Sequence, residues 1–131
     1  MDFDESLIKK HELEVGTFHF FKNYMVAEVK EGIAFSLENA TEMLQLAKEY
    51  YGNTTPFVYI TNRVNSYSFN PTHHFKTVAM FPNLQGYATV TYDGINHEIA
   101  KMEEAFMLKP AKNFQTLEQA IAWAKELIPR D

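Results

Sequence analysis

The chain has 131 residues, of which 46% are hydrophobic, and one domain of this size buries a substantial core without disulfides or metals. It contains no cysteine, which excludes a disulfide framework and any thiolate-bound zinc or iron–sulfur centre. The formal net charge of -5 argues against nucleic acid as a partner, because binding a phosphate backbone needs clustered Lys and Arg.

The amino-terminal ten residues are acidic and lack the apolar stretch of a signal peptide. No window approaches 18 uninterrupted apolar residues, so the sequence predicts no membrane span. We expect residues 1–10 to be a frayed or weakly helical lead-in to a single domain over residues 11–131. We also expect a cytoplasmic location.

The start of this domain predicts an antiparallel hairpin. Apolar residues alternate over 12–21, as in a strand, with an interruption at Gly16. Lys22 and Asn23 form a turn, and residues 24–30 resume as a second strand.

A helix is predicted from Ser36, its expected N-cap, to about Tyr51. Gly52 supplies the left-handed stop after it. The apolar face of this helix has three- and four-residue spacing and contains Leu37, Ala40, Met43, Leu44, Ala47 and Tyr51.

Residues 57–60 form a run of aromatic and β-branched side chains that predicts a strand. Because successive positions are apolar, we expect both faces of this strand to be covered, as in a parallel sheet. Asn70 and Pro71 then predict the N-cap and first turn of a short helix that ends near Pro82.

The last third of the chain predicts two further strand–helix units. Residues 86–92 alternate as a strand, and Asp93 caps a helix. Residues 111–114 form a short last strand, and Thr116 with Gln119 has the spacing of a capping box for the terminal helix. The apolar residues of the first of these helices are Ile95, Ile99, Met102 and Phe106.

The predicted order is ββαβαβαβα, which defines an α/β fold. Strand–helix–strand units are right-handed and make their strands parallel. We therefore expect a single-domain, mixed but mostly parallel sheet of about five strands, with helices packed on it and the first hairpin strand at an edge.

The loop after the strand at 57–60 is the best candidate site, because ligands of open α/β sheets bind beyond the carboxyl ends of the strands. Arg63 with Asn62, near the expected helix start, could hold a small anion or a carboxylate. The alternative is that Arg63 makes a structural hydrogen bond within the loop. The candidate residues for binding a ligand or partner are Asn62, Arg63, Ser66, Tyr67, Ser68 and Asn70.

The element order, the loop VYITNRVNSYSFNP and the ending NFQTLEQAIAWAKELI resemble the SpoIIAA-like group of the STAS and CRAL-TRIO-related proteins. The resemblance covers nearly the whole chain and implies a STAS-like regulatory or ligand-binding domain more than an enzyme. The residues that match the ending of that group are Phe114, Thr116, Ala120, Ile121, Ala122 and Trp123.

STAS relatives that antagonise anti-sigma factors have a phosphorylatable Ser or Thr in an Asp-Ser-Ser-Gly-like segment. Ser66 and Ser68 occupy the corresponding region here, without that segment. Phosphate there would benefit from a helix N-terminus and from Arg63. The alternative is that both serines satisfy backbone groups of the loop.

No residues form a recognisable catalytic or metal-binding motif, and we expect no cofactor. The adjacent His73 and His74 point about 100° apart on a helix, and His97 lacks the His-Glu-x-x-His spacing. Glu103 and Glu104 are interpreted as solvated charges on a helix.

Aromatic residues make up 15% of the chain and are expected mainly in the core. Some could instead form an apolar groove for a lipid-like molecule, a partner helix or a second copy of the chain. The residues expected around that groove are Tyr67, Phe69, Phe75, Met80 and Phe81.

The sequence thus predicts a non-enzymatic domain that binds a partner protein or small ligand at the loop after the third strand. The alternatives are a carrier of a lipid-like apolar ligand, a phospho-switch that uses a loop serine, and, last, an enzyme of unrecognised type. The edge strand and the excess of aromatics make a homodimer a further expectation.

Overall fold

Two antiparallel hairpins build one half of the main sheet. The computed structural model describes residues 7–65, 67–70 and 73–129. Strand β1 (Leu7–Leu13) pairs with β2 (Gly16–Phe21), and β2 pairs with β3 (Tyr24–Val29). A Cβ atom at Gly16 would lie 2.4 Å from the carbonyl oxygen of Glu28, so that this close approach requires glycine.

The other half of the sheet is parallel. Strand β5 (Phe57–Asn62) lies between β3 and β7 (Leu84–Val90), and β8 (Ala111–Phe114) follows β7. The six strands have the order β1-β2-β3-β5-β7-β8. A separate parallel pair joins β4 (Ala34–Phe35) to β6 (Ser68–Phe69).

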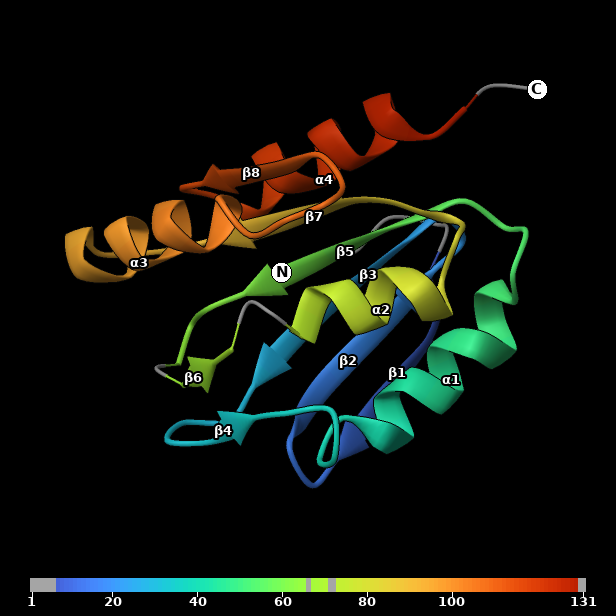
Figure 1. Cartoon of the computed structure of the whole chain (residues 1–131), viewed down its shortest axis with the longest axis horizontal. Helices are drawn as coiled ribbons and strands as arrows, with labels where there is room; N and C mark the ends of the chain where they lie inside the picture. Colours follow the sequence, from blue (N-terminus) through green and yellow to red (C-terminus); the bar gives the residue numbers. More distant parts are fainter. Residues whose placement is uncertain (1–6, 66, 71–72, 130–131) are drawn as a thin grey trace.

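In the part of the chain that the structure describes, four helices cover the two faces of the sheet (Figure 1). The helices α1 (Thr41–Tyr51), α2 (His74–Met80) and α3 (Gly94–Glu104) connect parallel strands and lie on one face, as successive right-handed crossovers require. Helix α4 (Leu117–Leu127) covers β5, β7 and β8 on the opposite face.

The core is accordingly divided by the sheet into two clusters. On one face, α1 packs over side chains that include Phe20, Met25 and Phe57. On the other, Ala120 and Ala124 of α4 belong to the cluster that contains Val58 and Ile60. Strand β5 is therefore covered on both faces, as its continuous apolar run predicted.

The α/β class and the mixed, mostly parallel sheet are confirmed, but the predictions for the first hairpin strand and for the number of strands are corrected. The strand predicted over residues 12–21 is divided between β1 and β2, and β2 lies between β1 and β3 and not at an edge. Residues 7–10, expected in the lead-in, begin β1, while residues 1–6 lie outside the described part. The sheet has six strands and a separate two-stranded pair, in place of about five strands. Strand β1 is exposed over most of its length, so it lacks the alternating pattern of a half-buried strand.

The predicted N-caps have mixed outcomes. Asp93 accepts a hydrogen bond from the Asn96 N–H at 2.9 Å, and Thr116 accepts one from the Gln119 N–H at 3.2 Å, so both caps are confirmed. Ser36 begins a turn closed by Asn39, and α1 starts only at Thr41.

The start of α2 was predicted wrongly at Asn70. The helix begins at His74, after His73 as N-cap residue, with no side-chain capping bond. Asn70 nevertheless contacts the residue at the start of the helix, because its carbonyl accepts a hydrogen bond from the His73 N–H at 3.0 Å. The predicted first-turn residue Pro71 lies outside the described residues.

Tyr51→Phe tests how the end of α1 is tied to the first hairpins. The buried Tyr51 hydroxyl donates to the carbonyls of Phe21 and Tyr24, each at 2.8 Å. Removing this donor from a buried site should lower the free energy of unfolding by about 1–3 kcal/mol in urea denaturation. Tyr50→Phe is the matched control, because its hydroxyl bonds the partly buried His11. An equal loss in the two variants would contradict this assignment.

Candidate functional site

An apolar cavity lies between the sheet and the helices α1 and α2. Its volume is about 60 Å³, and it is partly open to solvent. Among the described residues, no Asp, Glu, Lys or Arg side chain lines it. The lining residues come from β3, β5, β7, α1, α2 and the segments beside these helices, and they are Met25, Phe35, Ser36, Leu37, Ala40, Met43, Leu44, Ala47, Phe57, Tyr59, His73, Thr77, Phe81, Leu84 and Tyr87.

The cavity exists because small residues and a short helix cover this part of the sheet. Ala40 and Ala47 face it from α1 and its first turn, where a larger side chain would fill the space. Helix α2 has seven residues, and its Phe75 and Met80 are exposed to solvent. Phe81, directly after the helix, is the large residue that this segment buries in the core.

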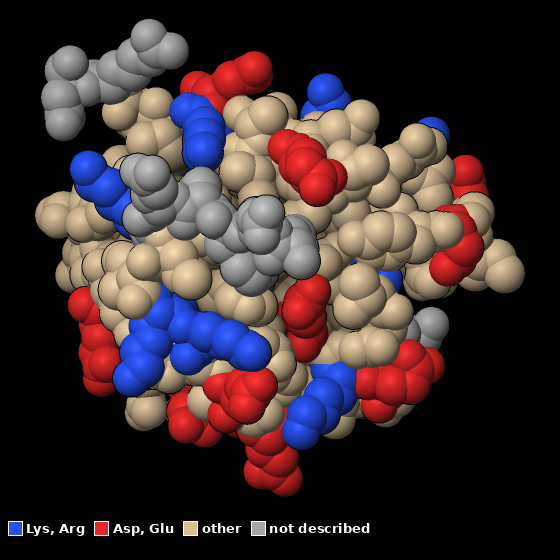
Figure 2. Space-filling model, turned by 180° about the vertical axis from the view of Figure 1, so that it is seen from behind, with Lys and Arg blue, Asp and Glu red and all other residues tan. Residues whose placement is uncertain are grey.

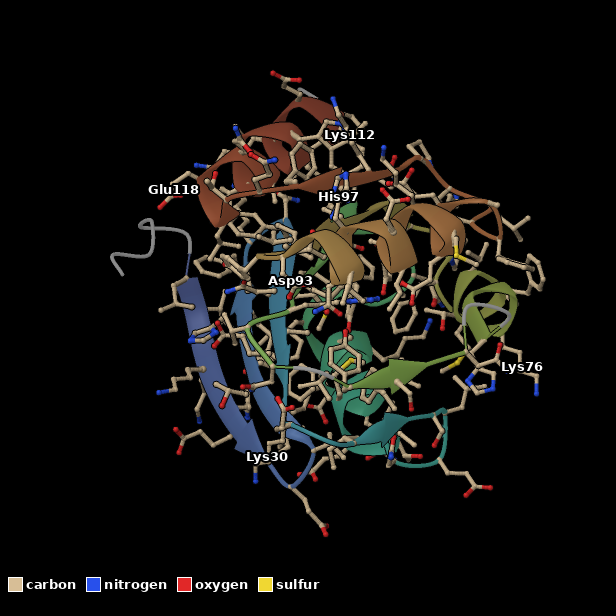
Figure 3. All side chains as sticks on the ribbon, turned by 90° about the vertical axis from the view of Figure 1, so that its left-hand side faces the viewer. Lys30, Lys76, Asp93, His97, Lys112 and Glu118 are labelled. Carbon is tan, nitrogen blue, oxygen red and sulfur yellow. The ribbon has the colours of Figure 1, made fainter. Side chains whose placement is uncertain are left out.

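Helix α2 is held mainly at its carboxyl end. The ammonium of Lys48, on α1, donates to the carbonyl of Met80 and lies 4.5 Å from the ring centroid of Phe81. A cation at a helix C-terminus also interacts favourably with the helix dipole. Lys76 on the same helix points away from the molecule (Figure 3). The carboxyl end of α2 is therefore tied to α1.

Hydrogen-bonding groups reach the cavity from two directions. The rings of Tyr59 and Tyr87 stack with centroids 5.1 Å apart on neighbouring strands. Burial raises the pKa of Tyr59 well above its usual value, and burial likewise raises the pKa of Tyr87. Both hydroxyls are consequently protonated at neutral pH. His73, at the start of α2, has a buried Nδ1 atom with no hydrogen-bond partner in the described part of the chain.

Arg63, predicted to face a ligand, is buried in an ion pair. Its guanidinium donates twice to the Glu103 carboxylate of α3, once at 3.3 Å, and lies 5.2 Å from the ring centroid of Tyr67. Burial opposes the charge of Arg63, while the Tyr67 and Tyr87 oxygens and the Glu103 carboxylate favour it and raise its pKa overall. Glu103, interpreted from sequence as solvated, is 7% exposed, so that interpretation was wrong.

Asn62 is likewise engaged by neighbouring elements. Its amide donates to the Glu28 carboxylate at 2.8 Å, and its oxygen accepts from the Tyr92 hydroxyl at 2.5 Å. Asn62 thus connects the end of β5 with β3 and with the segment that leads into α3. Its role as a ligand-binding residue stays a prediction.

Two other candidate binding residues of the loop, Tyr67 and Ser68, lie in different surroundings from each other. The Tyr67 hydroxyl is hydrogen-bonded to Thr61 at 2.5 Å. Ser68 is exposed in β6, where its N–H donates to the Ile33 carbonyl at 2.9 Å, and it lies six positions before α2. Ser66 lies outside the described residues. Phosphorylation of either serine stays a prediction.

The predicted aromatic groove is not formed as expected. Phe75 and Met80 are exposed, and among the predicted groove residues whose side chains are described only Phe81 lines the cavity; the Phe69 side chain lies outside the description. The sequence signal for the real cavity was the pair Ala40 and Ala47 on the apolar face of the first predicted helix. Their small size could not be distinguished from ordinary packing without the position of α2.

Helix α3 crosses the carboxyl ends of the strands with an unexpected orientation. Figure 3 looks onto this edge and shows Asp93 and His97 at its start. Its buried residues are Ala100 and Glu103. The predicted apolar residues instead face outward, with Ile95 78%, Ile99 42%, Met102 71% and Phe106 45% exposed.

The surface offers few further indications. Acidic and basic side chains are interspersed on the face shown in Figure 2. Among the described residues, no group of three His, Asp or Glu side chains could hold a metal ion. Within that same part of the chain, no helix is both long and apolar enough to cross a membrane.

Comparisons with known proteins identify the fold. No protein-family model matches the chain, and neither does any curated protein. The structure is similar to the crystal structure of an uncharacterized protein of the DUF3478 family with a SpoIIAA-like fold from Shewanella loihica PV-4. The TM-score is 0.58 at 13% sequence identity, and the match covers 88% of this chain and 90% of the other. The chain thus adopts the SpoIIAA-like fold that its sequence resembles.

Glu103→Gln tests whether the ion pair anchors α3. Removing one partner leaves the buried Arg63 charge uncompensated, which should lower the free energy of unfolding by about 3–5 kcal/mol. The double variant Arg63→Met/Glu103→Leu should lose less than Glu103→Gln, since it leaves no buried charge. Glu98→Gln, at an exposed position of the same helix, is the control in chemical denaturation. A loss no larger than that of Glu98→Gln would refute the anchoring role.

Proposed function

We propose that this protein is a non-enzymatic binding domain that holds a small apolar molecule in the cavity under α1 and α2. The observation that carries the proposal is the cavity itself, whose described lining residues include no Asp, Glu, Lys or Arg. Predominantly apolar concave sites with a few polar groups are the usual form of small-molecule sites. This is the carrier alternative considered from the sequence.

An empty apolar cavity is a cost to the folded state that a ligand removes. At about 24 cal/mol per Å³, leaving 60 Å³ unfilled costs about 1–2 kcal/mol. A ligand that fills this space gains the contacts that the protein alone does not make. Ligand binding should therefore stabilise the fold.

The volume of the cavity also limits which molecules it accepts. About 60 Å³ suits a few small groups and not a whole lipid. Uptake of a longer molecule therefore requires α2 to move relative to the sheet.

Binding and not catalysis is proposed because the cavity lacks an acid–base pair. It contains no Asp, Glu, Lys or Arg side chain, and His73 has no carboxylate partner among the lining residues. General acid–base chemistry requires such groups within hydrogen-bond reach of the reacting atoms. Recognition of a partner protein at residues 61–70 stays a prediction. Val64 and Ser68 in this segment are exposed and therefore accessible to a partner.

Titration with the neutral fluorophore N-phenyl-1-naphthylamine tests the proposal. Saturable binding is expected, with a rise in fluorescence as the dye leaves water. Ala47→Leu, which adds three carbon atoms to the lining, should weaken binding about tenfold or more, the equivalent of about 1.4 kcal/mol. Ala40→Leu is a second filling variant in case the first folds poorly.

Ala79→Leu is the matched control, because Ala79 is exposed on α2. It makes the same chemical change outside the cavity and should bind the dye as the unmodified protein does. The proposal fails if the unmodified protein shows no saturable binding. It also fails if both filling variants, folded, bind the dye with unchanged affinity.

A further inference from the structure

The cavity contains two hydrogen-bonding groups that the protein does not use. The Nδ1 atom of His73 is buried and has no partner among the described residues. No hydrogen bond to the Tyr59 hydroxyl is formed within the part of the chain that the structure describes. Both residues line the same cavity. A buried polar atom without a partner is costly, so a ligand that forms a hydrogen bond with the Nδ1 atom of His73 gains binding energy.

The protonation states favour an acceptor on the ligand. The Tyr59 hydroxyl is protonated at neutral pH, since burial holds its pKa well above the usual value. The Nδ1 atom of His73 is a donor in the tautomer that carries the ring proton on that atom, and this is the tautomer that the proposal assigns to it. Tyr59 and His73 line the same cavity, and a single oxygen atom with two lone pairs accepts from two donors.

The charge balance favours a neutral ligand. The nearest cation of the loop, Arg63, is already neutralised by the Glu103 carboxylate. The described residues that line the cavity include no Lys or Arg that would pair with an ionised carboxylate. Burial of an unpaired charge is far more costly than burial of a neutral carbonyl.

We propose that the ligand of this cavity is an apolar molecule with one neutral carbonyl group, whose oxygen accepts hydrogen bonds from Tyr59 and His73. The class comprises ketones, aldehydes and esters with a hydrocarbon chain. This inference rests on the proposed function and gives the cavity its chemical selectivity.

Competition against N-phenyl-1-naphthylamine with three probes of equal chain length tests the inference. The probes are octan-2-one, octane and octanoate, at pH 7. Tyr59→Phe and His73→Phe each remove one hydrogen-bonding group and retain a ring. Each should weaken binding of octan-2-one about 2- to 13-fold, the equivalent of one hydrogen bond. Octane should bind all three proteins with the same affinity.

Tyr92→Phe is the control, because its hydroxyl bonds Asn62 outside the cavity. It should leave the affinities for octan-2-one and octane unchanged. A loss for octan-2-one with none for octane would support the carbonyl contact, since a general packing defect would weaken both probes equally.

Three outcomes would overturn the inference. If octan-2-one and octane respond identically to Tyr59→Phe and His73→Phe, the cavity binds apolar molecules without reading a carbonyl, and only this inference fails. If octanoate binds more tightly than octan-2-one, the head group is an anion and the neutral class is wrong. If neither the dye nor any probe binds the unmodified protein, the proposed function fails together with it.

Discussion

The exclusion of water from both faces of β5 is the constraint on which the rest of the structure depends. Phe57, Val58 and Ile60 are almost completely buried, so each face of the sheet must be covered by helices. On one side α4 packs so closely that a Cβ atom at Gly86 would lie 2.6 Å from the Leu127 side chain. On the other side α1 and the short α2 leave a cavity. The unequal covering of the two faces provides the binding space.

The carboxyl edge of the sheet is organised by charge and hydrogen bonds. Arg63 ties the segment after β5 to α3 through Glu103, and Asn62 ties the same strand to Glu28 and Tyr92. Replacing a buried ion pair by well-packed apolar side chains is often neutral for stability. We therefore interpret the ion pair between Arg63 and Glu103 as a contact that fixes the position of α3. Because Arg63 is neutralised in this way, the adjoining cavity remains uncharged.

Helix α3 shows a consequence of that anchoring. Its inward side includes Glu103, and its residues Ile95 and Met102 are mostly exposed. A helix attached by an ion pair does not need an apolar inward face, so its outward side is free to be apolar. A row of exposed apolar residues such as Ile95, Ile99 and Met102 is unusual on a monomeric protein. Self-association and binding of a partner protein therefore both stay predictions.

The sequence predicted those elements whose burial or capping produces a local pattern. The apolar run of residues 57–60 and the caps at Asp93 and Thr116 are of this kind, and they were sufficient for the fold class. Strand β1 was missed because it is exposed, and Glu103 was misjudged because its partner, Arg63, is 40 positions away. The cavity depends on where α2 lies relative to Ala40 and Ala47, which no local pattern records.

Methyl NMR of the protein with ¹³C-labelled methionine tests most directly whether the cavity is the ligand site. Met25 and Met43 line it, whereas Met102 is exposed on α3. Addition of octan-2-one should shift the methyl resonances of Met25 and Met43 in a saturable manner and leave that of Met102 unchanged. Shifts confined to Met102, or no saturable shift at Met25 and Met43, would contradict the account.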